Sequence, residues 1–364
     1  MRKSRKLAES SSAISRIQGN SLAIHPVTTV TCPKPKKTSP PPITGLKSKK
    51  LIAFGWYGGK FSHLEWLLPL LPPCHHYCEP FAGSAAALLN RAPSPVETYN
   101  DLDGEVANFF RVLRDEKDRL IEAIGLTPFS REEFSIACVI DPDLSPLERA
   151  RRFFVRARQV RTGLAQTASL GRWANCKNTS RAGMSGVVSR WLGSVQDLPE
   201  IAERLLRVQI ENRPAIDVIR LYDSPETLSY CDPPYVHLTR GDRSAYGYEM
   251  SDDEHRELAK VLNSVQGMAA ISNYQCELMD ELYPAPKWTK SLASEKTIHS
   301  TKGKRVEALW TNYDPVKQSN LIHRLRIDYL DAYQALVLAE PESAVSQPLK
   351  EAFLALRQAA EADA

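Results

Sequence analysis

The chain reads Leu228-Ser229-Tyr230-Cys231-Asp232-Pro233-Pro234-Tyr235 where an apolar run meets two prolines. The apolar run predicts a buried strand, which the prolines end because they have a fixed φ and no backbone N–H. Asp232 can then present its carboxylate beside the carbonyl of Pro233, so that two acceptors hold one NH2 group. Tyr235 offers a π face to a planar base, a contact worth about 1–3 kcal/mol. The stretch favours a site for an exocyclic amine; the alternative is a strand-to-turn junction whose acid caps the next element.

A second strand, turn and helix is predicted around Glu79-Pro80-Phe81-Ala82-Gly83-Ser84. Residues 75–81 favour a short strand, Gly83 permits a close backbone approach, and residues 85–90 begin a helix with small residues that pack near a sheet. A nucleotide-like ligand fits on such a turn. Only Gly83 matches the three-glycine dinucleotide fingerprint, which disfavours a nicotinamide or flavin site.

An acid follows the next predicted strand. Residues 96–99 predict a second strand that ends in Asn100-Asp101-Leu102-Asp103. Asp101 is placed to accept hydrogen bonds from ribose hydroxyls, by the geometry of doubly wound nucleotide sites. Asp103 is expected to cap a helix over residues 104–114.

Two aromatic residues, two glycines and a lysine precede a helical stretch over residues 61–71. This sequence, Trp56-Tyr57-Gly58-Gly59-Lys60, suits a lid over an anionic or aromatic ligand. The alternative is an ordinary glycine turn with a solvated lysine.

Strands and helices alternate in the remainder of the chain. Residues 252–265 predict a helix with an apolar stripe, residues 268–272 a strand, and residues 308–312 a last strand. The alternation predicts an α/β fold with a mostly parallel central sheet and helices on both faces.

The charge is distributed unevenly. The whole chain carries +4, but residues 1–50 hold eleven lysines and arginines against Glu9, so they carry +10 and the remaining residues −6. Within that acidic remainder, residues 148–191 hold ten basic residues against Glu148 alone. Such a basic segment is typical of a surface that faces DNA, because phosphate neutralisation supplies most non-specific affinity. The alternative is a helix with a solvated basic face, and residues 149–160 have the apolar spacing of a half-buried helix.

Together these motifs resemble the Dam-type family of adenine-specific DNA methyltransferases, most closely its phage and prophage members. The resemblance covers residues 51–313 and rests on the order and spacing of the stretches quoted above. Residues 271–274 and 306–313 are similar to the later strands of the family. Ala85 departs from the pattern, since many members carry a second glycine there, and is expected to tighten the turn without abolishing it. The resemblance implies a Rossmann-like methyltransferase fold and S-adenosyl-L-methionine as the methyl donor.

The resemblance also implies roles for single residues. Asp232 and the Pro233 carbonyl would accept hydrogen bonds from N6 of an adenine turned out of the duplex, and Tyr235 would stack on that base. These three residues are the expected catalytic group, and the methyl group would pass directly to N6. The related families that methylate cytosine N4 place serine at position 232, and no cysteine has the context of a nucleophile for cytosine C5. The expected cofactor-binding residues are Trp56, Lys60, Glu79, Phe81, Gly83, Asp101 and Asp232.

DNA recognition in the family lies between the ribose acid and the tetrapeptide, where the basic segment falls. We expect residues 121–204 to form a helical insert in a catalytic domain of residues 51–120 and 205–313. Residues 162–186, rich in Gly, Ser and Asn, are expected to be a loop that orders on DNA. The expected DNA-binding residues are Arg158, Arg161, Arg172, Lys177 and Arg181.

The two ends of the chain have different characters. Residues 1–50, rich in Lys, Ser and Pro, predict a disordered basic tail, with a transit peptide as the alternative. Residues 314–364 predict a helical extension.

No run of about 18 apolar residues predicts a membrane span, and seven unpatterned cysteines fit a reducing compartment. We therefore expect a cytoplasmic, bacterial or phage-encoded monomer that acts on double-stranded DNA. Cys74-His75-His76-Tyr77-Cys78 suggests zinc, but no second ligand pair follows, so no metal is expected. Two other functions stay open: methyl transfer to an amine or amide of RNA or protein, and a catalytically silent DNA-binding relative.

Overall fold

The computed structural model describes residues 50–56, 58–162, 165, 168–236, 249–294 and 306–318. The chain divides into two compact units, residues 1–48 and 49–364, and every described residue belongs to the second. The predicted disordered tail, except Lys50, and the predicted helical extension beyond residue 318 lie outside the described residues.

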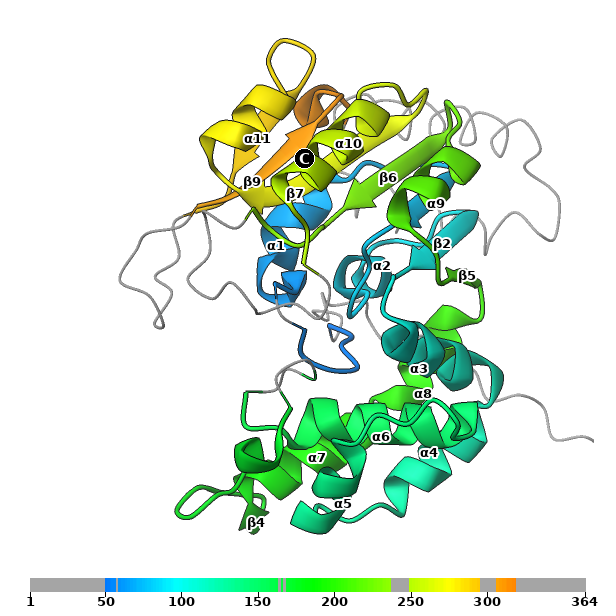
Figure 1. The fold of residues 1–364 in the computed structure, drawn as a ribbon, viewed down its shortest axis with the longest axis vertical. Helices are drawn as coiled ribbons and strands as arrows, with labels where there is room; N and C mark the ends of the chain where they lie inside the picture. The colour runs from blue at the N-terminus through cyan, green and yellow to red at the C-terminus, as the bar shows by residue number, and fades with distance from the viewer. Residues whose placement is uncertain are drawn as a thin grey trace, which may run out of the picture. The chain divides into compact units, whose positions relative to one another are not determined.

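The described residues contain a seven-stranded sheet in the order β5-β2-β1-β6-β7-β9-β8 (Figure 1). Neighbouring strands are parallel except at β9, which is antiparallel to both β7 and β8. The predicted Rossmann-like α/β fold is therefore confirmed. The strands are β1 (His76–Glu79), β2 (Val96–Asn100), β5 (Val208–Glu211), β6 (Thr227–Cys231), β7 (Met268–Tyr274), β8 (Thr289–Leu292) and β9 (Glu307–Thr311).

Helices cover both faces of the sheet, as predicted. Successive residues of a strand point to opposite faces, and here they pack into two separate cores. Tyr230 of β6 packs into one core and Cys231 into the other. Ala270 and Ile271 of β7 divide in the same way. Strands of such a sheet are buried on both faces, so most residues of β6 and β7 are buried. One core includes α1 (Leu64–Leu67), α2 (Ala86–Asn90) and α3 (Gly104–Asp115), and the other includes α9 (Ala215–Tyr222), α10 (Asp252–Leu262) and α11 (Glu277–Leu282).

The strand order reverses between β1 and β6. β2, which follows β1 in the chain, lies on one side of this pair, and β7, which follows β6, lies on the other. The parallel register pairs Glu79 with Tyr99 and Cys78 with Ser229, so the carboxyl ends of the three strands meet at one edge. In open α/β sheets ligands bind outside the carboxyl ends of the strands at such a reversal.

Between α3 and β5 the chain is mainly helical. The longest helix there, α6, begins at a Ser145 cap that accepts from the Glu148 N–H, and Pro146 occupies its first turn. Phe154 of α6 stacks on Phe109 of α3 at 5.6 Å, which confirms the half-buried helix predicted for this stretch. Asp103 caps α3 by accepting from the Glu105 N–H, also as predicted. The helices are α4 (Lys117–Gly125), α5 (Arg131–Ala137), α6 (Pro146–Gln159), α7 (Gly186–Gln196) and α8 (Leu198–Leu205).

The loop predicted over residues 162–186 contains a hairpin of β3 (Ser180–Arg181) and β4 (Met184–Ser185). The prediction of an irregular loop is wrong for these residues. Ala182 and Gly183 have positive φ angles of 52° and 74°, and two such residues in succession make the tight turn that joins antiparallel strands. The two turn residues are Ala182-Gly183, not the Asn-Gly or Asp-Gly pair that usually indicates such a turn in a sequence.

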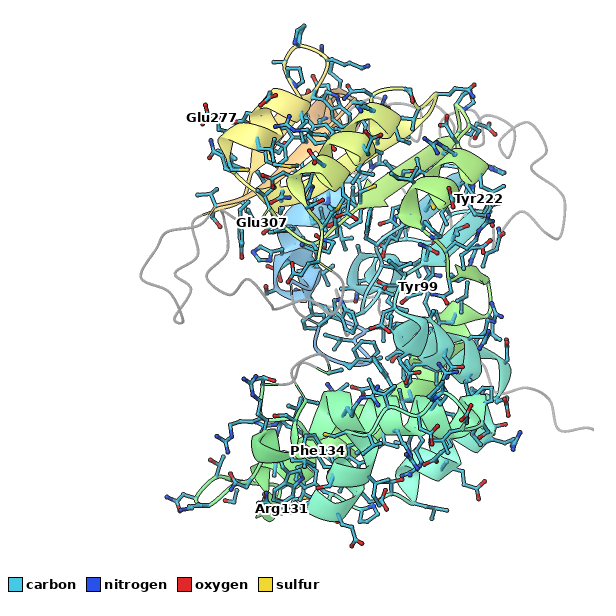
Figure 2. The ribbon with its side chains drawn as sticks, in the orientation of Figure 1. Tyr99, Arg131, Phe134, Tyr222, Glu277 and Glu307 are labelled. Atoms are coloured by element: carbon cyan, nitrogen blue, oxygen red, sulfur yellow. The ribbon has the colours of Figure 1, made fainter. Side chains whose placement is uncertain are left out.

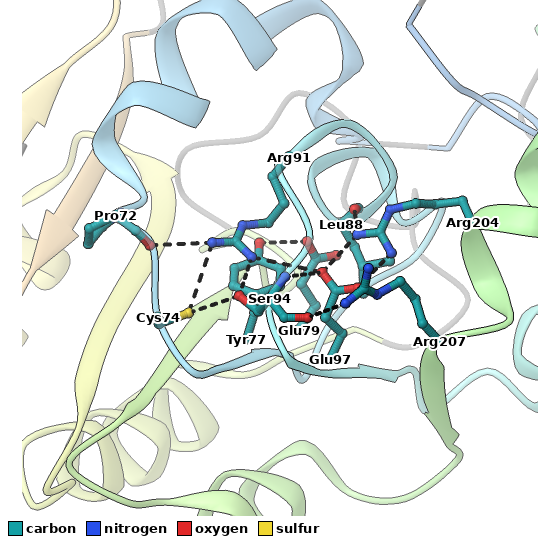
Figure 3. Close-up of polar contacts among 10 residues, drawn as sticks. All are labelled: Pro72, Cys74, Tyr77, Glu79, Leu88, Arg91, Ser94, Glu97, Arg204 and Arg207. Atoms are coloured by element: carbon teal, nitrogen blue, oxygen red, sulfur yellow. Dashed lines mark hydrogen bonds and ion pairs between the residues drawn. The ribbon is translucent and has the colours of Figure 1, made fainter. Parts of the chain in front are cut away.

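A buried ion network fastens α8 and α2 to β2 (Figure 3). Glu97 of β2 is fully buried, and Arg204 of α8 donates to its two oxygens at 2.6 and 2.7 Å. Arg207 and Arg91 lie 3.6 and 3.9 Å from the same carboxylate. Arg204 also donates to the Leu88 carbonyl of α2. Loss of one partner from such a network leaves a buried charge without compensation, so we infer that it stabilises this side of the sheet.

Candidate active site

A cavity of about 420 Å³ opens at the carboxyl ends of β1, β2 and β6. Its volume is in the range of small-molecule sites, and it lies where the strand order reverses. All seven residues predicted to bind a cofactor line it, namely Trp56, Lys60, Glu79, Phe81, Gly83, Asp101 and Asp232.

The turn after β1 brings the backbone close to this cavity. Gly83 has a φ of +48°, and a Cβ at this position would lie 2.5 Å from the Trp56 ring, so only glycine fits. Ala85, which precedes α2, also has a positive φ of 55°. A left-handed conformation costs an L-residue about 1–2 kcal/mol, which explains why glycine suits this position in related proteins. The turn forms despite Ala85, as expected.

Asp101 follows β2 and is oriented by backbone donors. The Gly83 N–H donates to its Oδ2 and the Asp103 N–H to its Oδ1, both at 2.8 Å. Burial raises the pKa of Asp101 to about 6, although these hydrogen bonds act in the opposite direction. Asn212 holds the same loop by donating to the Asp101 carbonyl at 2.7 Å. The Leu102 N–H also acts on this carboxylate. A carboxylate has about four lone-pair sites, so Asp101 can still accept a hydrogen bond from a hydroxyl group in the cavity.

Asp232 and Lys60 form the central ion pair of the site. Lys60 begins a 3-10 turn, η1 (Lys60–His63), and its Nζ lies 2.5 Å from Asp232 Oδ1. Burial alone would lower the pKa of Lys60, but Asp232 and Glu307 together hold it above its usual value. Burial raises the pKa of Asp232 to about 6, against the attraction of Lys60. At neutral pH the site therefore contains an ionised acceptor beside an ammonium group.

Tyr235 is buried and its hydroxyl donates to Glu307. Glu307 is the first residue of β9 (Figure 2). Its ring makes an edge contact with Tyr274 at 4.8 Å, and Lys60 Nζ lies 4.8 Å from its centroid. Burial, followed by the charge of Glu307, raises the pKa of Tyr235 well above its usual value. The hydroxyl is therefore neutral and fixes the orientation of the ring.

Glu79 lines the cavity with an uncharged carboxyl group at neutral pH. Burial raises its pKa to about 8, against a hydrogen bond from Tyr77 and the charge of Arg91. The Tyr77 hydroxyl donates to Glu79 Oε1 at 2.7 Å, and the Arg91 guanidinium covers the Tyr77 ring at 3.9 Å (Figure 3). These contacts hold the carboxyl group in one place at the end of β1.

Four of the five arginines of α6, namely Arg149, Arg151, Arg152 and Arg156, form ion pairs within the fold. Arg151 and Arg152 lie 2.7 and 2.8 Å from Glu148, and Arg156 lies 3.4 Å from Glu105. Their contribution to the basic segment is therefore balanced by neighbouring carboxylates.

The five predicted DNA-binding residues differ in exposure. Arg161, Arg172, Lys177 and Arg181 are exposed. Arg158 is half-buried beside the Phe154 ring at 6.0 Å, and burial lowers its pKa to about 10, so it keeps its charge at neutral pH.

The two tryptophans of the basic segment belong to its packing. Trp191 is buried and contacts Phe154 at 5.6 Å. The ring of Trp173 lies 5.4 Å from the Phe129 ring and 4.6 Å from the Arg131 guanidinium. Both rings are therefore engaged by the protein itself.

Sequence reasoning missed several residues of the site. The start of α9 lines the cavity with Pro214, Ala215 and Ile216, and the region of α10 adds Glu249, Met250, Glu254 and Glu257. No local pattern announces these residues, because folding alone brings their elements to the cavity. Glu307 had one available signal, since it is an acid at the start of an otherwise apolar strand.

Within the described part of the chain, no group of three or more His, Cys, Asp or Glu is arranged to hold a metal ion. Tyr77 and Cys78 of the sequence that suggested zinc lie in β1. No helix in the same part is long and apolar enough to span a membrane.

The family model of D12 class N6 adenine-specific DNA methyltransferases matches residues 56–302. The chain belongs to this family. The type II methyltransferase M1.LlaDCHI of Lactococcus lactis subsp. cremoris is 26% identical over 286 residues, which cover 71% of this chain and 94% of the relative. The rRNA methyltransferase aviRa of Streptomyces viridochromogenes has a solved structure with a TM-score of 0.29 and 15% identity, covering 71% of this chain and 84% of the other.

The cavity of this adenine methyltransferase fits a methyl donor that carries a nucleoside. Gly83 lets the backbone reach the cavity, Asp101 keeps acceptor capacity for hydroxyl groups, and Trp56 and Phe81 give it aromatic walls. Asp232 reaches the same cavity from the end of β6. The same cavity therefore has room for a nucleoside and contains Asp232, the acceptor expected for the target amine.

Proposed function

We propose that this methyltransferase transfers the methyl group of S-adenosyl-L-methionine to N6 of adenine at defined sites in double-stranded DNA. The position of Asp232 carries the proposal, since its carboxylate enters the cavity at the strand end and is followed by the Pro233 carbonyl. When bound, S-adenosyl-L-methionine supplies an electrophilic methyl group on a sulfonium. In this proposal Asp101 accepts from its ribose hydroxyls, Trp56 and Phe81 contact it, and the turn at Gly83 approaches its methionine part.

Asp232 and the Pro233 carbonyl act on the target amine by accepting its two hydrogen bonds. The lone pair of N6 is normally delocalised into the ring, and these acceptors favour the tetrahedral nitrogen in which it is localised. The amine becomes nucleophilic as it reacts, so the acceptors stabilise the transition state as well as position the base. Each effect is worth several kcal/mol in enzymes of known mechanism.

The target adenine must leave the base stack to reach Asp232, at a cost of a few kcal/mol that contacts in the protein offset. We propose that Tyr235 stacks on the extruded base. Its hydroxyl bond to Glu307 and its edge contact with Tyr274 favour one orientation of the ring before DNA binds.

We propose that residues 121–204 form the insert that recognises DNA. Its exposed basic residues support this role, because Arg161, Arg172, Lys177 and Arg181 have side chains that can reach phosphates. Arg158 is half-buried, and we propose that its charge adds to the positive potential of this surface. The proposed enzyme acts as a monomer, without a metal ion, in the cytoplasm where DNA is accessible.

Transfer of labelled methyl from S-adenosyl-L-methionine to unmethylated duplex DNA tests the proposal. We expect incorporation into DNA, with N6-methyladenine as the modified base by mass spectrometry and discrete methylated sites by sequencing. Incorporation into RNA or protein but not DNA would contradict the proposed substrate. Cofactor binding without incorporation into any of the three would point to a catalytically silent relative.

Activity is expected to fall as the pH is lowered through about 6. The pKa of Asp232 is raised to about 6. Below this pH the carboxyl group carries a proton and one of its oxygens becomes a donor, which opposes the N–H groups of the amine. Activity is therefore expected above this pH and lost below it. The measurement is the initial rate at saturating cofactor, which separates Asp232 from the similar titration of Asp101. An unchanged rate down to pH of about 5 would contradict the role of Asp232.

Replacing Arg181 and Lys177 together by alanine is expected to weaken binding to all DNA sequences. Each phosphate contact contributes about 0.9 to the slope of log affinity against log salt concentration, so the slope should fall by about 2. The control is Arg152→Ala, because Glu148 already engages that side chain. Equal salt slopes in the double variant and the unmodified protein would show that Lys177 and Arg181 do not contact DNA phosphates.

A further inference from the structure

We propose that Glu307 is a positioning residue that gives the Lys60 ammonium a second carboxylate, so that the buried group around Asp232 keeps one unbalanced negative charge at the cavity. The inference rests on the proposed function, because this charge matches the sulfonium of S-adenosyl-L-methionine. The demethylated product, S-adenosylhomocysteine, has a neutral sulfur in the same place. Glu307 would therefore favour the methyl donor over the spent product.

The geometry places one ammonium group between two carboxylates. Lys60 Nζ lies 2.5 Å from Asp232 Oδ1 and 3.4 Å from Glu307 Oε1, and it donates to the Gly58 carbonyl at 3.0 Å. The three acceptors match the three N–H groups of an ammonium. The side chains of Lys60 and Glu307 are only 3% and 6% exposed, so neither charge is screened by bulk water.

The charges of this group do not cancel. Asp232 and Glu307 carry two negative charges against one positive charge on Lys60, which leaves −1. Glu79 adds none at neutral pH, because burial raises its pKa to about 8. Other acids also line the cavity: Asp101 and Asp103 follow β2, and Glu254 and Glu257 are exposed on α10, where solvent weakens their charges. At the end of β6 the buried group of Asp232, Lys60 and Glu307 is therefore the local source of negative potential.

Glu307 reaches this place because β9 runs antiparallel to its neighbours. Tyr274, the last residue of β7, pairs with Glu307, the first residue of β9, so an amino-terminal residue lies at the edge where the parallel strands end. The same carboxylate accepts from the Tyr235 hydroxyl. Glu307, at the start of β9, thus contacts Lys60 of η1 and Tyr235 of the segment after β6.

Glu307→Gln isolates the charge from the shape, since its amide oxygen can still accept from Tyr235. The experiment is isothermal titration of the full chain with S-adenosyl-L-methionine and, separately, with S-adenosylhomocysteine. We expect the ratio of the two affinities to move toward the product by about tenfold in E307Q, because only the sulfonium senses the lost charge. A role in folding alone would weaken both ligands alike. Equal ratios in E307Q and the unmodified protein would overturn the inference.

Two further variants keep the test decisive. Glu307→Ala removes the same charge, so it should move the ratio in the same direction as E307Q, and it serves if E307Q does not fold. The control is Glu211→Gln. Glu211 also accepts a hydrogen bond from a tyrosine, the Tyr222 hydroxyl at 2.7 Å, but it does not line the cavity. Its ratio should not change. If the unmodified protein binds neither ligand, the proposed cofactor fails, which is a different result from binding with an unchanged ratio.

Discussion

Asp232→Asn is expected to lower kcat for adenine methylation by a factor on the order of 10²–10³ or more. The substitution keeps the size of the side chain but replaces one acceptor oxygen by an NH2 donor, which opposes the N–H groups of the target amine. Loss of a single hydrogen-bonding group aimed at the transition state costs about this much in enzymes where it has been measured. Lys60 would also lose the negative charge of its partner at 2.5 Å and keep only that of Glu307.

The measurement is single-turnover methyl transfer to duplex DNA at saturating enzyme and cofactor, so that weaker binding does not imitate slower chemistry. Cofactor binding by D232N should remain measurable by titration. Glu211→Gln is the matched control, since it removes a carboxylate from the end of another strand, β5, outside the cavity, and should methylate at the unmodified rate. A D232N rate within about fivefold of the unmodified rate would show that another group binds the amine.

Arg204→Ala is expected to lower the free energy of unfolding by about 3 kcal/mol. The change removes two hydrogen bonds from the fully buried carboxylate of Glu97 and one from the Leu88 carbonyl. Breaking a buried ion pair by removing one partner costs about 3–5 kcal/mol because the remaining charge is uncompensated. We expect a value at the lower end, since Arg207 and Arg91 stay 3.6 and 3.9 Å from the carboxylate.

Denaturant unfolding followed by circular dichroism measures this effect, provided that the transition of the described unit is cooperative. Arg119→Ala is the control, because Arg119 pairs with Glu116 on the exposed surface of α4 with 71% of its side chain accessible. Exposed pairs contribute less than about 1 kcal/mol, so this variant should unfold almost as the unmodified protein does. Equal losses in the two variants would mean that the network around Glu97 is no more important than a surface pair.

Both predictions concern carboxylates at strand ends or within strands, yet their environments differ. Glu97 faces three arginines and no cavity, so its interactions serve the fold. Asp232 shares one lysine with Glu307 and lines a cavity, so part of its hydrogen-bonding capacity is left for a ligand. This difference separates the stabilising acid from the proposed catalytic one.

The sequence by itself determined the elements whose signals are local. The strands β1, β2, β6 and β7 were predicted close to their observed bounds, because each is a short stretch that ends at a turn or at an acid. The resemblance to the methyltransferase family implied that the acids and glycine after those strands bind one cofactor. In the structure the carboxyl ends of the parallel strands share one edge. All seven predicted cofactor-binding residues accordingly line one cavity.

Only the tertiary structure decided which charges are free and which are paired. In the sequence the arginines of the basic segment cannot be told apart. In the structure Arg151 and Arg152 pair with Glu148, whereas Arg161, Arg172 and Arg181 are exposed to solvent. Glu307 lies 72 residues after Tyr235, and the antiparallel pairing of β9 with β7 brings it to the Tyr235 hydroxyl and the Lys60 ammonium. Local patterns report backbone geometry and burial, whereas the partner of a charge depends on contacts between distant parts of the chain.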